Sequence, residues 1–68
     1  METAAQKLGM NLKRIRTEKG ISQGSIARML KIDKAFISNI ENGKTNPTLA
    51  TIERIAAAIN VSVDELLR

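Results

Sequence analysis

The chain has 68 residues, of which 43% are hydrophobic and 26% are charged, and its formal net charge is +4. A chain of this length builds one hydrophobic core, so we expect a single domain over residues 1–68. Cysteine and histidine are both absent, which excludes disulfides and thiolate metal sites and removes the commonest general base. Asp, Glu and Lys remain as possible catalysts, but the chain has no paired carboxylates at helical spacing and no phosphate-binding glycine loop, so we expect no catalytic residue, no metal and no cofactor. No apolar run approaches the roughly 20 residues of a membrane span, and the first residues do not form a secretory signal.

The positive charge is concentrated in the first two-thirds of the chain. Residues 7–44 carry nine Lys or Arg against three Asp or Glu, whereas residues 45–68 carry two against three. This asymmetry favours a polyanionic partner. A solvated, lysine-rich surface would have the same composition, so charge alone leaves both interpretations open.

Hydrophobic periodicity predicts five helices and no strand, at about residues 3–19, 23–30, 34–42, 49–59 and 63–67. The first helix is predicted to end at Gly20, a residue type that favours the left-handed conformation after a helix. Its apolar stripe consists of Ala5, Leu8, Leu12 and Ile15. Gly9 lies inside this helix, and we expect it to weaken the helix by about 1 kcal/mol relative to alanine.

The second and third helices are both short. Ser22 is the predicted N-cap of the second and Asp33 that of the third. Their predicted buried residues are Ile26, Ala27 and Leu30, then Phe36, Ile37 and Ile40. Neither helix would persist alone in water, and only about three residues join them. They must therefore cross steeply and share their apolar faces, which is the helix-turn-helix arrangement.

The fourth and fifth helices complete the predicted bundle. Thr48 is the predicted N-cap of the fourth helix, and Asn60 is its predicted left-handed terminator. The longest apolar stripe of the chain lies in this helix: Leu49, Ile52, Ile55, Ala56 and Ile59. Ser62 and Glu65 match the capping box of a last short helix. The sequence thus predicts an all-α, compact five-helix bundle.

Four segments together resemble the Cro and lambda-repressor type of helix-turn-helix domain, also called the XRE family. They are LKRIRTEKGISQ (12–23), IA (26–27), FISNIENGKTNPTL (36–49) and IAAAINVSVDELL (55–67). The resemblance covers about residues 8–67. It implies a lambda-repressor-like fold and sequence-specific binding of double-stranded DNA by a transcription regulator of the repressor or controller type. It also implies a homodimer on a palindromic operator, in the cytoplasm of a bacterium or of the bacterial host of a phage.

The third helix of such domains lies in the major groove with its N-terminal part against base edges. Helical spacing places four small or polar residues opposite the apolar face of this helix: Lys34, Ala35, Ser38 and Asn39. Asn39 would pair with adenine, Lys34 would donate to guanine, and the Ala35 methyl group would meet a thymine methyl group. Taken alone, these residues favour a solvated helix face over base contact. The resemblance makes base contact the expectation.

The resemblance also implies contacts to the DNA backbone around the third helix. The predicted phosphate-contacting residues are Gln23, Asn42, Lys44, Thr45 and Asn46. Gln23 begins the second helix, and the alternative interpretation is an ordinary first-turn residue with no contact to DNA. For Asn46 and Pro47, the alternative interpretation is an ordinary turn sequence.

Arg16 and Glu41 are assigned to the scaffold, because the corresponding residues of the family form a partly buried ion pair. Lys31 departs from the family pattern, since the turn between the second and third helices commonly has glycine there. If its backbone is left-handed, we expect a strain of about 1 kcal/mol. Gly24 likewise makes the second helix intrinsically weak.

The C-terminal end carries more apolar surface than one short helix needs. The predicted dimer interface consists of Val61, Val63 and Leu67, whereas Leu66 is expected to complete the core. Because the chain shows no further domain after Arg68, no small-molecule ligand is expected. An alternative function uses the same fold as a protein-interaction module or antitoxin, with DNA binding secondary.

Overall fold

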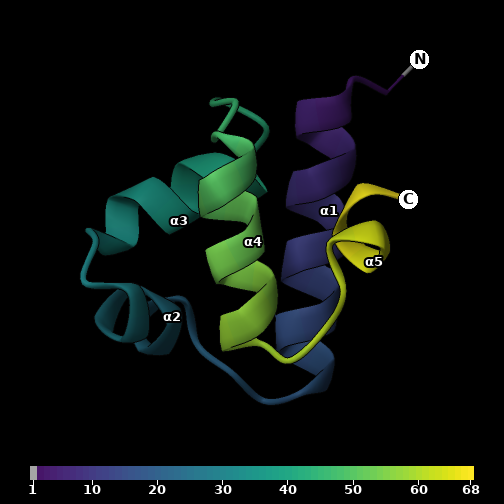
Figure 1. Cartoon of the computed structure of the whole chain (residues 1–68). Helices are drawn as coiled ribbons and strands as arrows, with labels where there is room; N and C mark the ends of the chain where they lie inside the picture. Colours follow the sequence, from purple (N-terminus) through teal and green to yellow (C-terminus); the bar gives the residue numbers. More distant parts are fainter. Residues whose placement is uncertain (1) are drawn as a thin grey trace.

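The computed structural model describes residues 2–68, and within them the chain forms five helices and no strand (Figure 1). The helices are α1 (Ala4–Glu18), α2 (Gln23–Leu30), α3 (Lys34–Glu41), α4 (Leu49–Ala58) and α5 (Val63–Leu67). α3 packs on α1 and α2, α4 packs on α2 and α5, and α5 packs on α1. The predicted all-α bundle is confirmed. Its helices begin or end at most one residue inside the predicted ranges, because the cap residues were counted in those ranges.

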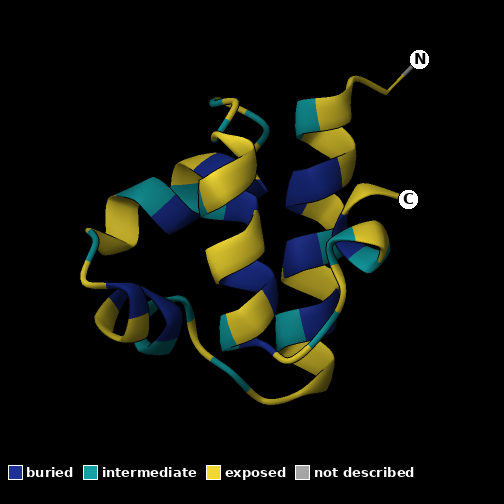
Figure 2. Cartoon of the chain, viewed as in Figure 1, coloured by how far each residue is buried: buried dark blue, intermediate teal, exposed yellow. Residues whose placement is uncertain are grey.

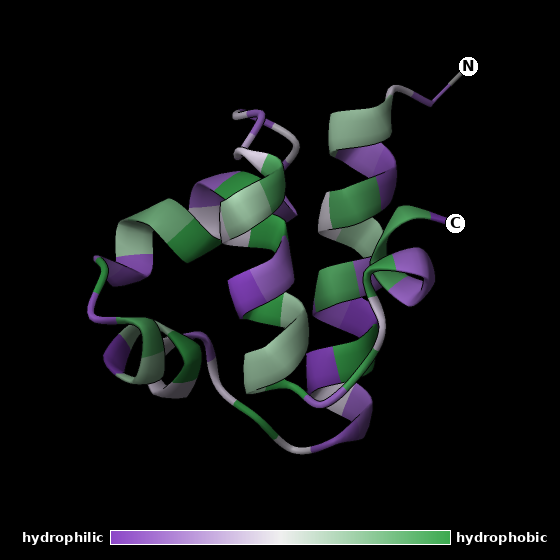
Figure 3. Ribbon diagram, viewed as in Figure 1, coloured by the Kyte–Doolittle hydropathy of each residue, from purple (hydrophilic) through white to green (hydrophobic). Residues whose placement is uncertain are grey.

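One aliphatic core holds the five helices together. Its residues are Leu8, Leu12, Ile15, Ile26, Ala27, Leu30, Ile37, Ile40, Ile52, Ile55, Ala56, Ile59 and Leu66. Figure 2 shows these buried positions on the inward sides of the helices, and the same inward sides carry much of the hydrophobic colour in Figure 3. Leu66 is fully buried, as expected. Phe36 is only half-buried and packs against the edge of the core.

Leu49 is not a core residue, which corrects the prediction for the fourth helix. Its side chain is 61% exposed, whereas Ile52, one turn later, is buried. Hydrophobic periodicity identifies the side of a helix that faces a core. It does not say how far along that helix the neighbouring elements extend, and Leu49 is the first residue of α4, outside the covered part.

Side-chain caps fix the start of four helices. Thr3, Ser22, Thr48 and Ser62 each accept a hydrogen bond from the backbone N–H three residues later. Thr3 and Gln6 form a complete capping box, which the T-x-x-Q pattern would have revealed.

Two cap predictions were wrong in detail. Asp33 occupies the N-cap position of α3, but its side chain makes no capping hydrogen bond. The Ser62 hydroxyl accepts from Glu65 N at 3.2 Å, yet the Glu65 carboxylate lies 3.5 Å from that same hydroxyl oxygen and makes no hydrogen bond to the Ser62 backbone. The box at Ser62 is therefore only half formed, and a sequence pattern cannot specify the rotamer that completes it.

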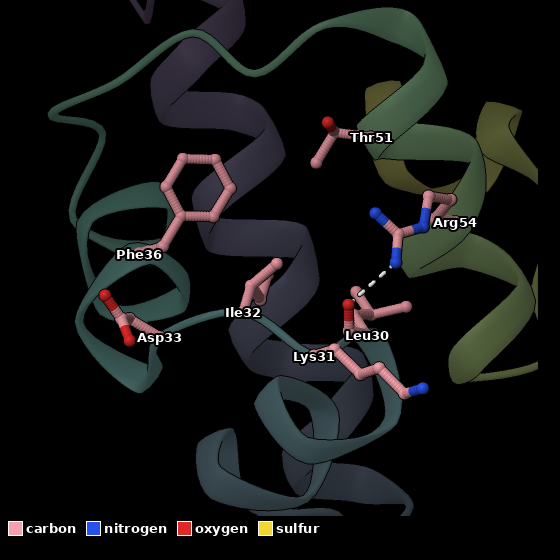
Figure 4. A pocket seen from close by; sticks show the side chains of 7 residues that line it. All are labelled: Leu30, Lys31, Ile32, Asp33, Phe36, Thr51 and Arg54. Carbon is pink, nitrogen blue, oxygen red and sulfur yellow. Dashed lines mark hydrogen bonds between the residues drawn. The ribbon is translucent and has the colours of Figure 1, made fainter.

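The turn between α2 and α3 is left-handed at Lys31, with φ 58° and ψ 45°. Lys31 N donates to Arg28 O and Ile32 N donates to Ala27 O, which is the Schellman ending of a helix. The Arg54 side chain adds a bond from α4, because its Nη2 donates to Leu30 O at 2.7 Å (Figure 4). A non-glycine residue in this conformation costs about 1–2 kcal/mol. Lys31 thus has the left-handed backbone for which the sequence predicts strain.

Gly9 lies against the end of α3, which adds a packing role to the weak helix propensity expected of it. A Cβ atom added to Gly9 would lie 2.4 Å from Ile40 O and 2.6 Å from Glu41 O. Both obstructing atoms belong to backbone, so no side-chain rotation relieves the clash. Glycine at this position lets α1 lie directly against the end of α3.

Candidate nucleic-acid interface

The outward face of α3 is exposed and makes no side-chain hydrogen bond. Lys34, Ala35 and Asn39 are exposed and Ser38 is half-buried. None of the side-chain hydrogen bonds within residues 2–68 involves Lys34, Ser38 or Asn39. The four predicted base-reading residues therefore share one accessible face, and the polar atoms of their side chains remain available to a partner.

The opposite face of α3 anchors the helix in the core. Ile37 and Ile40 are fully buried, and α3 packs on both α1 and α2. Gly43, with φ 70°, ends the helix, where its N–H donates to Ile40 O and the N–H of Lys44 donates to Asn39 O. Because the C-terminal end of α3 is closed by these bonds and one side of the helix is packed in the core, the outward face is presented as a preformed ridge.

The predicted phosphate-contacting residues lie around this ridge. Asn42, Lys44 and Asn46 are exposed at or after the C-terminal end of α3, and Thr45 is half-buried. Lys34 and Lys44 take part in none of the ion pairs formed within the described part of the chain. Their charge is therefore available to an anion, and Lys34 stands at one end of α3 and Lys44 just past the other.

Arg16 and Glu41 form a two-pronged ion pair between α1 and α3. Arg16 Nε donates to Glu41 Oε2 at 2.5 Å, and Arg16 Nη2 donates to Glu41 Oε1 at 2.9 Å. The two side chains are 15% and 3% exposed. Arg16 Nη1 also donates to Ile21 O at 3.3 Å, which ties the loop before α2 to the same group.

The hydrogen bonds to Glu41 raise the pKa of Arg16, and partial burial opposes them. A raised pKa in the folded state stabilises the fold at every pH below the ordinary value for arginine. That stability is lost only when the pH rises through the folded pKa, in the strongly alkaline range. The Arg16 guanidinium group is therefore fully protonated near neutral pH.

Gln23 joins this ion pair, a contact that sequence reasoning missed. Its Nε2 donates to Glu41 Oε1 at 2.8 Å, so the carboxylate binds residues from α1 and α2 at once. Gln23 remains half-buried at the start of α2. Gln23 and Glu41 are 18 residues apart and lie on different helices, so hydrophobic periodicity cannot predict their contact. The bond becomes visible only when α2 and α3 are placed against each other.

The predicted dimer residues differ in exposure. Val61 and Val63 are half-buried and pack against the core, whereas Leu67 is 42% exposed. Other exposed large hydrophobic residues are Met10 on α1, Met29 on α2 and Leu49 on α4. Leu67 is therefore the main apolar contribution of α5 to the surface.

A hollow beside the helix-turn-helix is distinct from the outward face of α3. It lies between the Lys31–Asp33 turn and α4, with Phe36 on one wall and Thr51 and Arg54 on the other (Figure 4). Residues 2–68 contain no cluster of acidic side chains suited to a metal ion. None of the helices in this part of the chain has the length and apolar character needed to cross a membrane.

The family model described as helix-turn-helix matches residues 12–66. This range spans α2, the left-handed turn and α3, and it reaches α5. The chain belongs to the helix-turn-helix family, of the XRE type that its motifs resemble.

Two relatives of the chain are named as regulatory proteins. Over 61 residues the chain is 39% identical to the control protein C.MunI of a Mycoplasma species, covering 88% of this chain and 82% of that protein. It is 38% identical to the transcriptional regulator SinR of Bacillus subtilis, covering 88% of this chain but only 55% of SinR. The chain thus spans about half the length of that relative.

A solved structure of similar fold includes DNA. The restriction-modification controller protein C.Esp1396I, a tetramer in complex with its natural 35-base-pair operator, superimposes with a TM-score of 0.81. Sequence identity is 29%, and each chain is covered completely.

Proposed function

We propose that this chain is a transcription regulator that binds double-stranded DNA with α3 in the major groove. The observation that carries the proposal is the two-sided character of α3. Ile37 and Ile40 are fully buried on one side, while Lys34, Ala35, Ser38 and Asn39 have free polar or methyl groups on the other. Asn39 has the donor and acceptor to pair with adenine, and Lys34 has donors for guanine.

Gln23, Asn42, Lys44, Thr45 and Asn46 are proposed to contact phosphates. Supporting this, Lys44 and Asn46 are exposed in the segment that follows α3 directly. Phosphate contacts set the affinity and orientation of the protein, whereas contacts of α3 with base edges set its sequence preference.

On DNA we propose a homodimer that binds a palindromic operator. The C.Esp1396I complex supports an oligomer on operator DNA in a related controller protein. Val61, Val63 and Leu67 are the proposed interface, in which Leu67 supplies the exposed apolar side chain. A two-fold dimer of this kind places two recognition helices about 34 Å apart.

The proposed role requires no catalysis and no cofactor. Its site of action is bacterial DNA, so we place the protein in the cytoplasm with the nucleoid. C.MunI is named as a control protein and SinR as a transcriptional regulator, and both names agree with a regulatory rather than an enzymatic role.

A fluorescence anisotropy titration of a labelled mixed-sequence duplex at increasing salt tests the proposal. Affinity is expected to fall with salt, with a slope of about −0.9 per phosphate contact in a plot of log K against log salt. An affinity that does not change with salt, or no binding at low salt, would contradict DNA binding. A parallel titration of single-stranded DNA is the matched control for duplex recognition.

A further inference from the structure

One buried carboxylate joins the scaffold to a residue of the proposed DNA-contacting surface. The Glu41 side chain is 3% exposed, and its two oxygens accept three hydrogen bonds, two from Arg16 and one from Gln23. Arg16 lies on α1, Gln23 on α2 and Glu41 on α3, so three helices meet at this group. The two bonds from Arg16 belong to the scaffold, since they join α1 to α3. The third bond reaches the half-buried side chain of Gln23, for which it is the one side-chain hydrogen bond within residues 2–68.

We propose that Glu41 is a positioning residue for DNA binding, because it holds the side-chain amide of Gln23 in one orientation at the start of α2. The inference rests on the function proposed above and deepens it. It assigns to Glu41 a role in affinity that is separate from its role in stability, and that acts only through Gln23.

The chemistry of the two side chains fixes which end of the amide faces inward. A carboxylate only accepts hydrogen bonds, so the amide must present Nε2 to Glu41 and cannot present its carbonyl oxygen. The inverted amide would place two acceptor oxygens against each other. The –NH2 group has two N–H donors, one of which is used at Glu41. The second N–H remains for a phosphate oxygen, which is itself only an acceptor.

Holding the amide in advance also favours binding. A glutamine side chain has several rotatable bonds, and freezing them when DNA binds costs conformational entropy. The bond to Glu41 restricts those rotations before DNA arrives, and preorganisation of this kind raises affinity without a new contact. The half-buried position of Gln23 agrees with a side chain that is held at one end and open at the other.

Arg16 has a matching part in this arrangement. An unpaired carboxylate beside the start of α2 would repel a DNA phosphate. The two bonds from Arg16 neutralise Glu41 while leaving Oε1 able to accept from Gln23 as well. The group is therefore electrically neutral toward DNA, and its effect on binding is one of geometry.

A double-mutant cycle on DNA affinity tests the proposal without changing net charge. The positioning group is removed by the paired change Arg16→Met and Glu41→Met, because exchanging a buried ion pair for apolar side chains of similar size often preserves stability. Gln23→Ala is made in the wild-type and in the Met/Met background. The probe is a mixed-sequence duplex of about two helical turns, and folding of each variant is checked by circular dichroism at the assay temperature.

In the wild-type background, Gln23→Ala is expected to weaken binding about tenfold, the value of one hydrogen bond to a charged group. In the Met/Met background the same change is expected to alter affinity less than about twofold, because an unheld amide contributes little. An equal loss in both backgrounds would show that Glu41 acts only in the scaffold and would overturn the inference. Failure of the wild-type protein to bind the duplex would instead overturn the proposed function itself.

A measurement on the unmodified protein keeps the inference testable if the Met/Met variant does not fold. NMR relaxation of side-chain amide groups, without DNA, is expected to give Gln23 Nε2 an order parameter above about 0.6, and exposed Asn39 a lower one. Equal, low values for both amides would show that Glu41 does not hold Gln23, and would refute the positioning role.

Discussion

Alanine substitution at two helical glycines is expected to change stability in opposite directions. Alanine favours a helix by about 1 kcal/mol over glycine when nothing else changes. A Cβ atom added to Gly24 would lie 3.5 Å from Arg28 Nη1 and 3.8 Å from Ser22 Oγ, which are ordinary contacts. Gly24→Ala is therefore expected to raise the free energy of unfolding by about 0.5–1 kcal/mol.

At Gly9 the added Cβ atom would meet the backbone of α3. Carbon and oxygen atoms normally approach no closer than about 3.3 Å, whereas the distance to Ile40 O would be 2.4 Å. The helices would have to move apart by about 0.9 Å to restore that contact distance. Overpacking costs about 1–3 kcal/mol or more. The upper end applies because both obstructing atoms are backbone, and we expect a net loss of about 2 kcal/mol after the gain in helix propensity.

Urea and thermal unfolding followed by far-ultraviolet circular dichroism measure both effects. For a domain of this size, 1 kcal/mol corresponds to about 4–8 °C in Tm. Gly9→Ala is therefore expected to lower Tm by about 8–16 °C, while Gly24→Ala raises it by a few degrees. If Gly9→Ala stabilised the protein as Gly24→Ala does, the close packing of α1 on α3 would be refuted.

Three further predictions concern the turn, the ion pair and the DNA surface. Lys31→Gly is expected to raise stability by about 0.5–1 kcal/mol, because glycine removes the left-handed strain at φ 58° but has more freedom when unfolded; a matching gain in thermal unfolding for Lys31→Ala would rule this out. Glu41→Ala is expected to lower stability by about 3–5 kcal/mol, since it leaves Arg16 partly buried without its partner, and equal Tm values for Glu41→Ala and Asn39→Ala would refute the scaffold role. Lys44→Ala is expected to weaken binding of all duplexes alike and to reduce the salt slope by about 1, and a change of sequence preference in competition titrations would argue against a phosphate contact.

Much of the fold follows from local sequence signals. The stripe Leu8, Leu12 and Ile15 predicted the buried side of α1, and Ser22 and Thr48 predicted helix starts, because a periodic stripe and a cap each depend on residues within a few positions. Asn60 was likewise predicted to end α4 in the left-handed region, and it has φ 59°.

The errors arose where the answer depends on elements distant in the sequence. Gly9 has an unfavourable propensity, and its use is visible only when Ile40 and Glu41 are placed against it. Leu49 has the correct spacing for the core, but as the first residue of α4 its side chain is left 61% exposed.

The candidate site divides in the same way. The face of α3 could be predicted, since one helical repeat places Lys34, Ala35, Ser38 and Asn39 together and the structure leaves them accessible. The bond from Gln23 to Glu41 could not be predicted, because two helices must cross before those side chains meet. Sequence reasoning thus identified the outward face of α3, and the structure adds the bond that holds Gln23 at the start of α2.

The most direct test of α3 as the DNA-reading element is selection of bound sequences from a random duplex pool, by the wild-type protein and by Asn39→Ala. The wild type is expected to enrich a palindrome whose half-sites lie about one helical turn apart. Asn39→Ala is expected to enrich a palindrome with the same half-site spacing but without a base preference at one position of each half-site. The lost discrimination at that position is expected to be about 1–3 kcal/mol. No enriched sequence for the wild type, or an identical sequence preference for both proteins, would contradict the reading of DNA by this face.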